Sequence, residues 1–328
     1  MPCYNASAIL DEAIESILRQ SLVDFELVAV NDGSTDDTVT RLIQWARADA
    51  RIKPVSQPHK GIVHALNFGM EFCHSPYIAR MDADDRSLEH RLELQANFLD
   101  ENPHVDLVSC QVCGFPNGQV REGFRIYLDW LNSLLTDADI RREIFVESPL
   151  PHPSVMYRKR RVIAVGAYQE VAWAEDYDLW LRLYLAGAHF AKLPQVLMEW
   201  REHPQRLTRI DSRYSLENFL RAKAQYLVRG PLQERDAVII WGAGMMGRRL
   251  GKQLLKLDVP VKAFVDIDAR KIGRTRLGKK VISPVDLPDC WRNQRHPIIL
   301  ACVGARGARQ LIRQRLAGMG FEEGRDWW

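Results

Sequence analysis

The sequence lacks the features of a membrane-spanning or secreted protein. It contains no run of about 18 apolar residues, the length a transmembrane helix needs, and its N-terminus shows no signal-peptide pattern. It also lacks an excess of one charge, because 45 Lys and Arg residues face 42 Asp and Glu residues for a formal net charge of +3. Nucleic-acid binding usually needs a concentrated basic face, so we expect no nucleic-acid partner. These absences favour a cytoplasmic protein.

Cysteine is scarce and scattered, which argues against a disulfide framework. The six cysteines stand at positions 3, 73, 110, 113, 290 and 302. Cys110 and Cys113 form a CxxC pair inside an apolar segment that is typical of a strand. No second CxxC follows, and structural zinc normally takes four ligands. We expect structural cysteines in a reducing compartment, with zinc or redox chemistry as the open alternative.

The first two-thirds of the sequence alternates between helix and strand patterns. Apolar residues three and four positions apart predict amphipathic helices, and short apolar runs that end in Asn, Asp or Gly predict strands. This alternation predicts an α/β fold with a mostly parallel sheet covered on both faces, whose ligands bind beyond the carboxyl ends of the strands. The expected helices cover 8–20, 36–48, 61–73 and 88–99, and the expected strands cover 25–30, 77–81 and 105–112.

A second α/β pattern begins near Gly230-Pro231. Apolar runs at Ala237–Trp241 and Val261–Val265 predict two strands with a helix between them. The length of 328 residues suggests about two domains. We therefore expect one domain over 1–230 and a small Rossmann-like α/β domain over 231–328.

The N-terminal turn Pro2-Cys3-Tyr4-Asn5 lacks the strand that should lead into it. Only Met1 precedes the turn, and a parallel sheet that opens with a helix loses a central strand. From this pattern we expect a sheet whose first strand is missing, through a misassigned start codon or a truncated chain.

Carboxylates crowd together directly after the expected strand 77–81, in Asp82-Ala83-Asp84-Asp85. Neighbouring carboxylates repel one another, and a cation between them relieves that repulsion. Mg²⁺ and Mn²⁺ take oxygen ligands and commonly bind one or two carboxylates together with substrate phosphates. The cluster therefore indicates a metal–diphosphate site, while a solvated turn or a helix N-cap is the alternative.

Four motifs occur in order along the chain: the Pro2–Asn5 turn, Val30-Asn31-Asp32-Gly33-Ser34-Thr35-Asp36, the segment 61–67 and Met81–Asp85. Together they resemble family 2 glycosyltransferases of the GT-A fold, over roughly residues 1–210. The resemblance implies a GT-A nucleotide-sugar-binding sheet and a metal-dependent, inverting sugar transfer. The implied cofactor is Mn²⁺ or Mg²⁺.

The resemblance also implies the partners of this transfer. The donor would be a nucleotide-sugar with UDP as its nucleotide, and the acceptor would be a hydroxyl of a glycan or of a lipid-linked sugar used as a surface-polysaccharide precursor. Peripheral contact with the inner face of the membrane and association into a homo-oligomer stay open.

Several residues of the first domain take donor-side roles through the resemblance. Asp32 would accept a hydrogen bond from the uracil ring, although a turn former in Asn-Asp-Gly-Ser is the alternative. Asp82 would face the ribose or the sugar, and Asp84 would bind the metal. The other implied residues are Pro2, Tyr4, Asn5, Lys60, Arg80 and Arg201 for the donor and His203 for the metal. For the last four, a solvated or structural role is the alternative.

Glu175 and Asp176 resemble the acidic pair in which the family's aspartate is the general base. An acceptor hydroxyl must lose its proton as it attacks, and a carboxylate within hydrogen-bond reach can take that proton. We expect Asp176 to be this base and Glu175 to orient the acceptor, while favourable charges at a helix N-terminus are the alternative. His152 and Trp180 are expected beside the acceptor.

The first domain also contains a basic run, Arg158-Lys159-Arg160-Arg161. Such a run is usually a solvated face of the protein. Contact with a lipid phosphate or an anionic membrane surface is the alternative, because clustered Lys and Arg attract anionic headgroups.

The second domain carries the fingerprint Gly242-x-Gly244-x-x-Gly247 between a strand and a helix, with Asp266 about 20 residues further on. Glycines permit a tight turn and a close approach of the backbone to a diphosphate, which the helix N-terminus attracts. The neighbouring segments resemble the small Rossmann-like domain of some bacterial sugar acyltransferases, which implies a nucleotide-linked sugar at these four residues. A structural or dimerising domain with a vestigial loop is the alternative.

Three rival functions remain open from the sequence. A sugar nucleotidyltransferase also needs acids and a metal, but such enzymes usually carry a Gly-rich loop after their first strand. An oxidoreductase built on the fingerprint at Gly242–Gly247 would leave the upstream acids unexplained. A catalytically inactive nucleotide-sugar-binding protein is consistent with a missing first strand.

Overall fold

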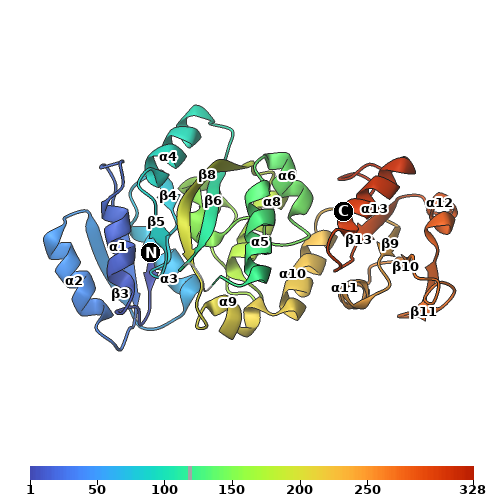
Figure 1. The fold of residues 1–328 in the computed structure, drawn as a ribbon, viewed down its shortest axis with the longest axis horizontal. Coiled ribbons are helices and arrows are strands. Elements are labelled where there is room, and N and C mark those ends of the chain that lie inside the picture. Colours follow the sequence, from blue (N-terminus) through green and yellow to red (C-terminus); the bar gives the residue numbers. More distant parts are fainter. Residues whose placement is uncertain (117–119) are drawn as a thin grey trace. The chain divides into compact units, whose positions relative to one another are not determined.

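The computed structural model describes residues 1–116 and 120–328 (Figure 1). These residues divide into two compact units, Met1–Ile210 and Asp211–Trp328. Each unit contains sheets with helices packed against them, as the sequence predicts for an α/β protein.

The division between the units lies before the expected boundary at residue 230. Helix α10 (Leu216–Val228) packs against α11 (Met245–Leu255), which belongs to the second unit. The sequence placed the domain boundary at Gly230-Pro231, after this helix. The packing of the structure places the helix itself in the second unit.

The first unit begins with a parallel sheet of order β1-β2-β3 and three helices. These elements are β1 (Pro2–Cys3), α1 (Leu10–Leu18), β2 (Leu27–Asp32), α2 (Thr38–Ala48), β3 (Ile52–Gln57) and α3 (Ile62–Phe72). Leu27 and Ala29 of β2 belong to the core formed with α1 and α2, while Val28 and Val30 pack with α3. Burial on both faces explains why β2 is a continuous apolar run.

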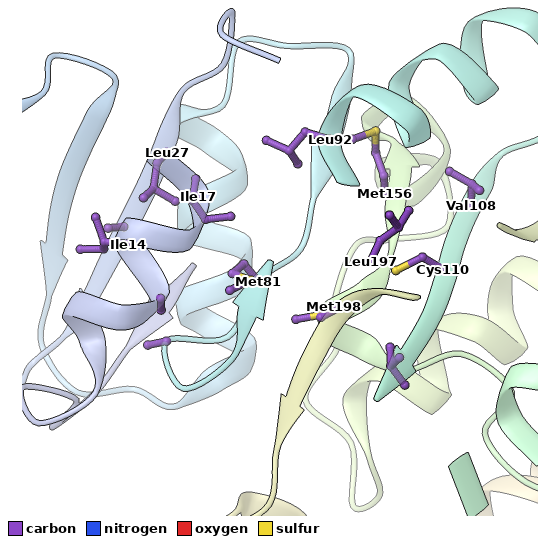
Figure 2. Packing of buried hydrophobic residues seen from close by; sticks show 14 of the residues in the cluster. Ile14, Ile17, Leu27, Met81, Leu92, Val108, Cys110, Met156, Leu197 and Met198 are labelled. Carbon is purple, nitrogen blue, oxygen red and sulfur yellow. The ribbon is translucent and has the colours of Figure 1, made fainter. Parts of the chain in front are cut away.

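The three helices lie within their predicted ranges, because their apolar residues recur at helical spacing and face the sheet. Figure 2 shows Ile14 and Ile17 of α1 close to Leu27 of β2. This packing fixes the position of β2, whose carboxyl end carries Asp32.

The first strand of the sheet, which the sequence analysis expected to be missing, is present as a short strand. Pro2 and Cys3 form β1 and pair with Val30 and Asn31 of β2. The amino group of Met1 donates to the carbonyl of Val28 at 2.9 Å and extends the same ladder. Beside it lies a cavity of about 410 Å³ lined by residues of β2, α3 and the next strand, Tyr77–Ala79.

A second sheet of the first unit has the order β4-β7-β6-β8-β5. Its strands are β4 (Tyr77–Ala79), β5 (Arg86–Ser87), β6 (Leu107–Phe115), β7 (Met156–Arg158) and β8 (Phe190–Arg201). β6 and β8 run parallel, whereas the other three pairs are antiparallel. This sheet is therefore mixed, which differs from the mostly parallel sheet that the alternating pattern predicts.

Helices flank this mixed sheet on its long central strands. They are α4 (Arg91–Glu101), α5 (Glu122–Ser133), α6 (Asp137–Glu143), α7 (Lys159–Ala164), α8 (Glu175–Leu185) and α9 (Leu207–Ile210), with a short 3₁₀ turn η1 (His152–Ser154). Leu92 of α4, Cys110 of β6, Met156 of β7 and Met198 of β8 form part of the core (Figure 2). Cys110 is thus a buried core residue, as the structural interpretation predicts, and each of the six cysteines is free.

The second unit contains one sheet of order β11-β12-β10-β9-β13. Its elements after α10 are β9 (Ala237–Trp241), α11 (Met245–Leu255), β10 (Val261–Val265), β11 (Thr275–Arg276), β12 (Lys279–Ile282), α12 (Leu287–Arg292), β13 (Pro297–Ala301) and α13 (Ala308–Gly318). β12, β10, β9 and β13 are parallel. Strands β9 and β10 have the bounds that their apolar runs predict.

Candidate active site

The acidic cluster follows β4 and contains the carboxylates of Asp82, Asp84 and Asp85. One ligand atom from each lies within 4.8 Å of the others. Asp85 is 1% exposed, and its Oδ2 atom has no hydrogen-bond partner among the described residues. A buried carboxylate oxygen without a donor is costly, so these three carboxylates form a candidate cation site.

The pKa values of the cluster reflect this crowding. Burial raises the pKa of Asp85, and the charges of Asp84 and Asp82 raise it further. Burial also raises the pKa of Asp82, although Arg80 opposes this. Burial also acts to raise the pKa of Asp84, but the hydrogen bond from His203, together with the charges of His203 and Arg206, lowers it overall. Hard carboxylate oxygens beside an imidazole nitrogen suit Mg²⁺ or Mn²⁺.

The end of β8 brings two further predicted residues to the cluster. His203 Nε2 lies 2.9 Å from Asp84 Oδ2. Arg201 donates from its backbone N to Asp85 Oδ1 at 2.8 Å and from Nε to the carbonyl of Asp84 at 2.6 Å. Its guanidinium also pairs with Glu12. Arg201 therefore fixes the acid-bearing loop, in addition to any contact with a phosphate.

The two cations expected at the phosphates lie in different environments. Arg80 is 4% exposed and pairs with Asp82, and its charge also acts on Asp176. The Lys60 side chain is exposed. Arg80 is thus a buried link between the acidic cluster and Asp176, which the sequence did not predict.

The carboxylate of Asp32 lies at the end of β2 and is buried. It accepts hydrogen bonds from Gln57 Nε2 at 2.6 Å, Lys60 N at 3.0 Å and Gly61 N at 2.8 Å. His59 Nδ1 lies 2.9 Å from its other oxygen. Burial raises the pKa of Asp32, but these donors outweigh it and hold the pKa below its ordinary value. An imide N–H could reach this carboxylate only by displacing one of these donors.

An aromatic platform stands next to this carboxylate. The rings of Tyr4 and His59 stack with centroids 4.0 Å apart, and Tyr4 is half exposed. Asn5 has a positive φ of 48° and is tied to the loop after β2, because Ser34 Oγ accepts from its N–H and its Oδ1 accepts from Thr35 N. The predicted Pro2–Asn5 turn thus borders the loop that follows β2.

Asp176 and Glu175 begin helix α8. Burial and the adjacent charge of Glu175 raise the pKa of Asp176 to about 7. Its Oδ1 accepts from the N–H of Tyr177 at 2.7 Å, which anchors the side chain at the helix start. A carboxylate with a pKa near neutrality can both hold and release a proton at physiological pH.

Two residues expected beside the acceptor are buried instead. His152 is 6% exposed, and its Nε2 lies 2.8 Å from Tyr168 Oη. Burial lowers the pKa of His152 well below its ordinary value, so the ring is neutral. Trp180 is fully buried and packs edge-on against His152 with centroids 5.8 Å apart. Helix α8 turns the Trp180 ring into the core, so the predicted acceptor contact of Trp180 stays a prediction without exposed ring surface to support it.

The sequence analysis gave no separate role to three residues of this region. Asp85 stood within the predicted acidic cluster, and the structure brings its carboxylate close to those of Asp82 and Asp84. Arg206 pairs with Glu202 at 3.1 Å and lies over Trp200 at 4.3 Å, and its charge acts on the acidic cluster. Tyr168 had no sequence signal, because its partners come from distant segments.

The basic run around α7 serves mainly to hold the first unit together. Arg158 donates to three backbone carbonyls. Lys159 Nζ donates to the carbonyl of Cys73 at 2.7 Å, and Arg161 Nε lies 2.9 Å from Asp106. These three partly buried side chains contact other segments of the first unit, whereas Arg160 is exposed, as a solvated face predicts.

The glycine fingerprint of the second unit joins β9 to α11. Gly242 has φ +126°, and a Cβ there would lie 2.3 Å from the carbonyl oxygen of Cys302. A Cβ on Gly247 would lie 1.8 Å from the carbonyl oxygen of Gly242. A Cβ on Gly244 would meet nothing within 4 Å. Internal packing therefore accounts for the first and third glycines, and only Gly244 borders open space.

Asp266 follows β10 and closes onto the glycine loop. Its Oδ2 accepts from Ala243 N at 3.0 Å and from Lys271 Nζ at 3.0 Å, and its Oδ1 accepts from Asp268 N at 3.0 Å. Burial raises its pKa, but these donors lower it below the ordinary value. Both oxygens are engaged within the chain, so a ribose at Asp266 would have to displace a donor.

Comparison with known proteins places the first unit in context. The family described as "Glycosyl transferase family 2" matches residues 1–165. The amylovoran biosynthesis glycosyltransferase AmsE of Erwinia amylovora is 34% identical over 195 residues, covering 58% of this chain and 70% of that protein. The UDP-Gal:alpha-D-GlcNAc-diphosphoundecaprenol beta-1,3-galactosyltransferase of Escherichia coli is 29% identical over 193 residues, covering 58% of this chain and 68% of that protein.

Two solved structures are similar in fold. S. aureus TarS 1–349 in complex with UDP-GlcNAc matches with a TM-score of 0.51 and 18% identity, over 78% of this chain and 69% of that one. The mannosyltransferase PcManGT of Pyrobaculum calidifontis, in complex with GDP-Man and Mn2+, matches with a TM-score of 0.50 and 17% identity, over 98% of this chain and 79% of that one. At these identities the likeness shows the fold, which is GT-A as the sequence predicts.

Proposed function

The chain belongs to glycosyl transferase family 2 and is a glycosyltransferase of polysaccharide biosynthesis, and we propose that it moves a sugar from a UDP donor to an acceptor hydroxyl with inversion. The observation that carries this proposal is the pair of acidic centres in one unit. One is the crowded cluster Asp82–Asp85, and the other is Asp176, with a pKa of about 7.

In this proposal Asp176 is the general base. Its carboxylate takes the proton of the acceptor hydroxyl while that oxygen attacks the anomeric carbon. The bond from the anomeric carbon to the diphosphate breaks on the opposite face, so the configuration inverts and no protein nucleophile is needed. Glu175 supplies the negative charge that raises the pKa of Asp176 toward neutrality.

The cluster of Asp82, Asp84 and Asp85, with His203, would hold a divalent cation. Such a cation supplies positive charge that stabilises the departing diphosphate. The orphan oxygen of Asp85 and the mutual repulsion of the carboxylates support this assignment. Mn²⁺ is proposed ahead of Mg²⁺, because imidazole is a better ligand for the softer ion.

The proposed donor nucleotide is uridine diphosphate. The Tyr4–His59 platform offers a flat surface to a base, and the Asp32 carboxylate beside it would accept from the base by exchanging one of its present donors. The names of the Escherichia coli relative and of the TarS complex both include a UDP-sugar, which supports the same donor here. Lys60 is the exposed cation proposed for the phosphates.

The proposed acceptor is a sugar hydroxyl of a glycan or of a lipid-linked precursor. The Escherichia coli relative is named for a diphosphoundecaprenol-linked acceptor, which supports the lipid-linked alternative. Within the described ranges 1–116 and 120–328, no helix is long and apolar enough to cross a bilayer. Any contact with the membrane through these residues would therefore be peripheral.

The function is tested with a panel of UDP- and GDP-sugars, Mn²⁺ and an acceptor mixture. Transfer with release of UDP, and an inverted anomeric centre in the product by NMR, are expected. Release of pyrophosphate from UTP and a sugar phosphate would instead identify a nucleotidyltransferase. UDP binding without turnover of any donor would identify an inactive binding protein.

Asp84→Ala removes a central carboxylate of the proposed metal site. UDP affinity measured by titration calorimetry should lose its dependence on Mn²⁺, because the diphosphate then lacks its bridging charge. Glu89→Ala, an exposed acid outside the cluster, is the control and should bind UDP as the unaltered protein does. Unchanged Mn²⁺ dependence in the Asp84 variant would remove this carboxylate from the metal site.

For the second unit we retain the nucleotide-binding proposal in a narrower form. Gly244 borders open space at the N-terminal end of the 11-residue helix α11, where a diphosphate would be attracted. Asp266 supports the loop rather than presenting a free carboxylate. NMR shift mapping of the full chain with UDP-sugars, NAD and CoA tests this, and an absence of shifts at 242–247 would leave a structural domain.

A further inference from the structure

A buried polar chain lies behind the catalytic acids. Tyr168, in the loop between α7 and α8, places its hydroxyl 2.8 Å from His152 Nε2. The other ring nitrogen of His152, Nδ1, lies 3.8 Å from Glu175 Oε1. Tyr168, His152 and Glu175 are 3%, 6% and 1% exposed, so none of them can contact the acceptor freely.

The position of Tyr168 is fixed from helix α3. Asn67 Nδ2 donates to the carbonyl of Tyr168 at 2.8 Å, and Asn67 Oδ1 accepts from the N–H of Tyr168 at 3.0 Å. His64, on the same helix, lies 3.2 Å from Glu170 of the same loop. The loop before α8 is therefore attached to the helix that covers β2, and Tyr168 has little freedom to move.

The surroundings of the two ring nitrogens determine which one carries the proton in neutral His152. A neutral imidazole has one N–H, and Nδ1 faces the carboxylate of Glu175. A lone pair on Nδ1 would be repelled by that carboxylate, whereas an N–H there is attracted to it. The arrangement therefore puts the proton on Nδ1 and makes Nε2 an acceptor for the O–H of Tyr168.

We propose that Tyr168 is a positioning residue of the transfer reaction. Its hydroxyl donates to His152 Nε2 and so turns the Nδ1–H of His152 toward the carboxylate of Glu175, the sequence neighbour of Asp176. This inference rests on the proposed role of Asp176 as the base. Tyr168 touches neither substrate nor reacting atoms in this scheme and acts through His152 and Glu175.

The charged and titratable groups around these acids come from several elements. Those acting on Asp176, Glu175, His152 or Tyr168 are Arg80 next to β4, Tyr157 on β7 and Tyr127 on α5. Tyr157 hydrogen-bonds to Tyr168, and Arg80 is a permanent cation paired with Asp82. Among all these residues only His152 has two neutral tautomers, so the Tyr168 hydroxyl acts on the site by selecting the tautomer of His152.

Tyr168→Phe removes the hydroxyl and keeps the buried ring. We expect kcat to fall about tenfold with the donor KM unchanged, because the base is misplaced rather than the donor site. The midpoint of the kcat–pH profile should shift from about 7, because Glu175, whose charge adds to burial in raising the pKa of Asp176, is no longer held in place through His152. ¹⁵N NMR of the His152 ring should show Nδ1–H in the unaltered protein and a mixture of tautomers in the variant.

Tyr177→Phe is the matched control. It removes another buried hydroxyl, which donates to the carbonyl of Ile144 at 2.7 Å, and it keeps the backbone N–H that contacts Asp176. This variant should lose thermal stability without a change in pH midpoint or tautomer. An unchanged His152 tautomer in Tyr168→Phe, or effects equal to those of the control, would overturn the proposal. The NMR experiment needs no turnover, so its result is separate from failure of the proposed function.

Discussion

At the scale of single residues, the chemistry of the site depends on where each carboxylate lies. Asp176 has a raised pKa because burial and Glu175 disfavour its charge, whereas Asp32 has a lowered pKa because four donors surround it. The same side chain type thus has a raised pKa in one place and a lowered pKa in another. This division is the physical basis for the proposed roles of the two aspartates.

Asp176→Asn tests two things together: the proposed role of Asp176 as the base, and the destabilisation of the native state by its ionised carboxylate. Transfer should fall by about 10²–10⁴-fold, because Asn cannot take the acceptor proton. The folded pKa of about 7 lies above the unfolded value of 3.8, so ionised Asp176 destabilises the native state increasingly as pH rises between these values. The variant should therefore have a higher Tm than the unaltered protein at pH 8 and an equal Tm near pH 4.

Calorimetric melting across pH 4–8 and initial rates with a saturating donor provide these measurements. A loss of less than about tenfold in kcat would show that another group is the base. A Tm difference that does not grow with pH would show that Asp176 is not desolvated as the structure indicates.

At the scale of elements, the atoms packed around each glycine of the β9–α11 turn determine whether that glycine serves internal packing or borders open space. The turn from β9 to α11 brings the carbonyl of Gly242 against Gly247, whereas Gly244 has no neighbour for a Cβ. A fingerprint read from spacing alone treats the three glycines as one motif. The structure separates two that permit internal packing from one that faces outward.

Gly247→Ala should destabilise the second unit by about 1–3 kcal/mol or more, because its Cβ would lie 1.8 Å from a backbone oxygen that cannot move freely. Gly244→Ala, with an ordinary φ of −78°, should leave stability within about 0.5 kcal/mol. Urea unfolding followed by circular dichroism compares the two. Equal stability losses would contradict the packing described here for this turn.

Most elements of the first 80 residues and strands β9 and β10 follow from sequence periodicity. Their apolar residues face a core at regular spacing, as Ile14 and Ile17 do in α1. The antiparallel pairing of β4 with β7 could not be predicted in this way, because the two strands lie about 80 residues apart and share no local signal. For the same reason the mixed second sheet was expected to be mostly parallel.

At the scale of the whole molecule, the chain consists of two compact units, and each carries its own candidate ligand loop. The acids and the proposed base lie within Met1–Ile210. A ligand that binds only the native state of one unit stabilises that unit and leaves the other unaffected. Ligand effects can therefore be assigned to a unit by measurements with residue resolution.

Hydrogen exchange of the full chain with UDP and Mn²⁺ should slow in the loops after β2 and β4, whether or not the separate loop 242–247 also binds a nucleotide. Saturation at about 100 times Kd would stabilise the first unit by about 2.7 kcal/mol. In the Asp84→Ala variant, the part of this protection that depends on Mn²⁺ should be lost. Protection at the glycine loop instead would place the UDP site in the second unit.

The sequence by itself determined the α/β class, the order of the motifs and the acids that follow strands. These features depend on local spacing and on residue types, which a linear pattern records. Only the tertiary structure decided that Trp180 is buried, that Arg80 links Asp82 to Asp176, and that Tyr168 reaches His152. Burial and charge coupling depend on segments distant in sequence, and these raise the pKa of Asp176 and lower that of His152.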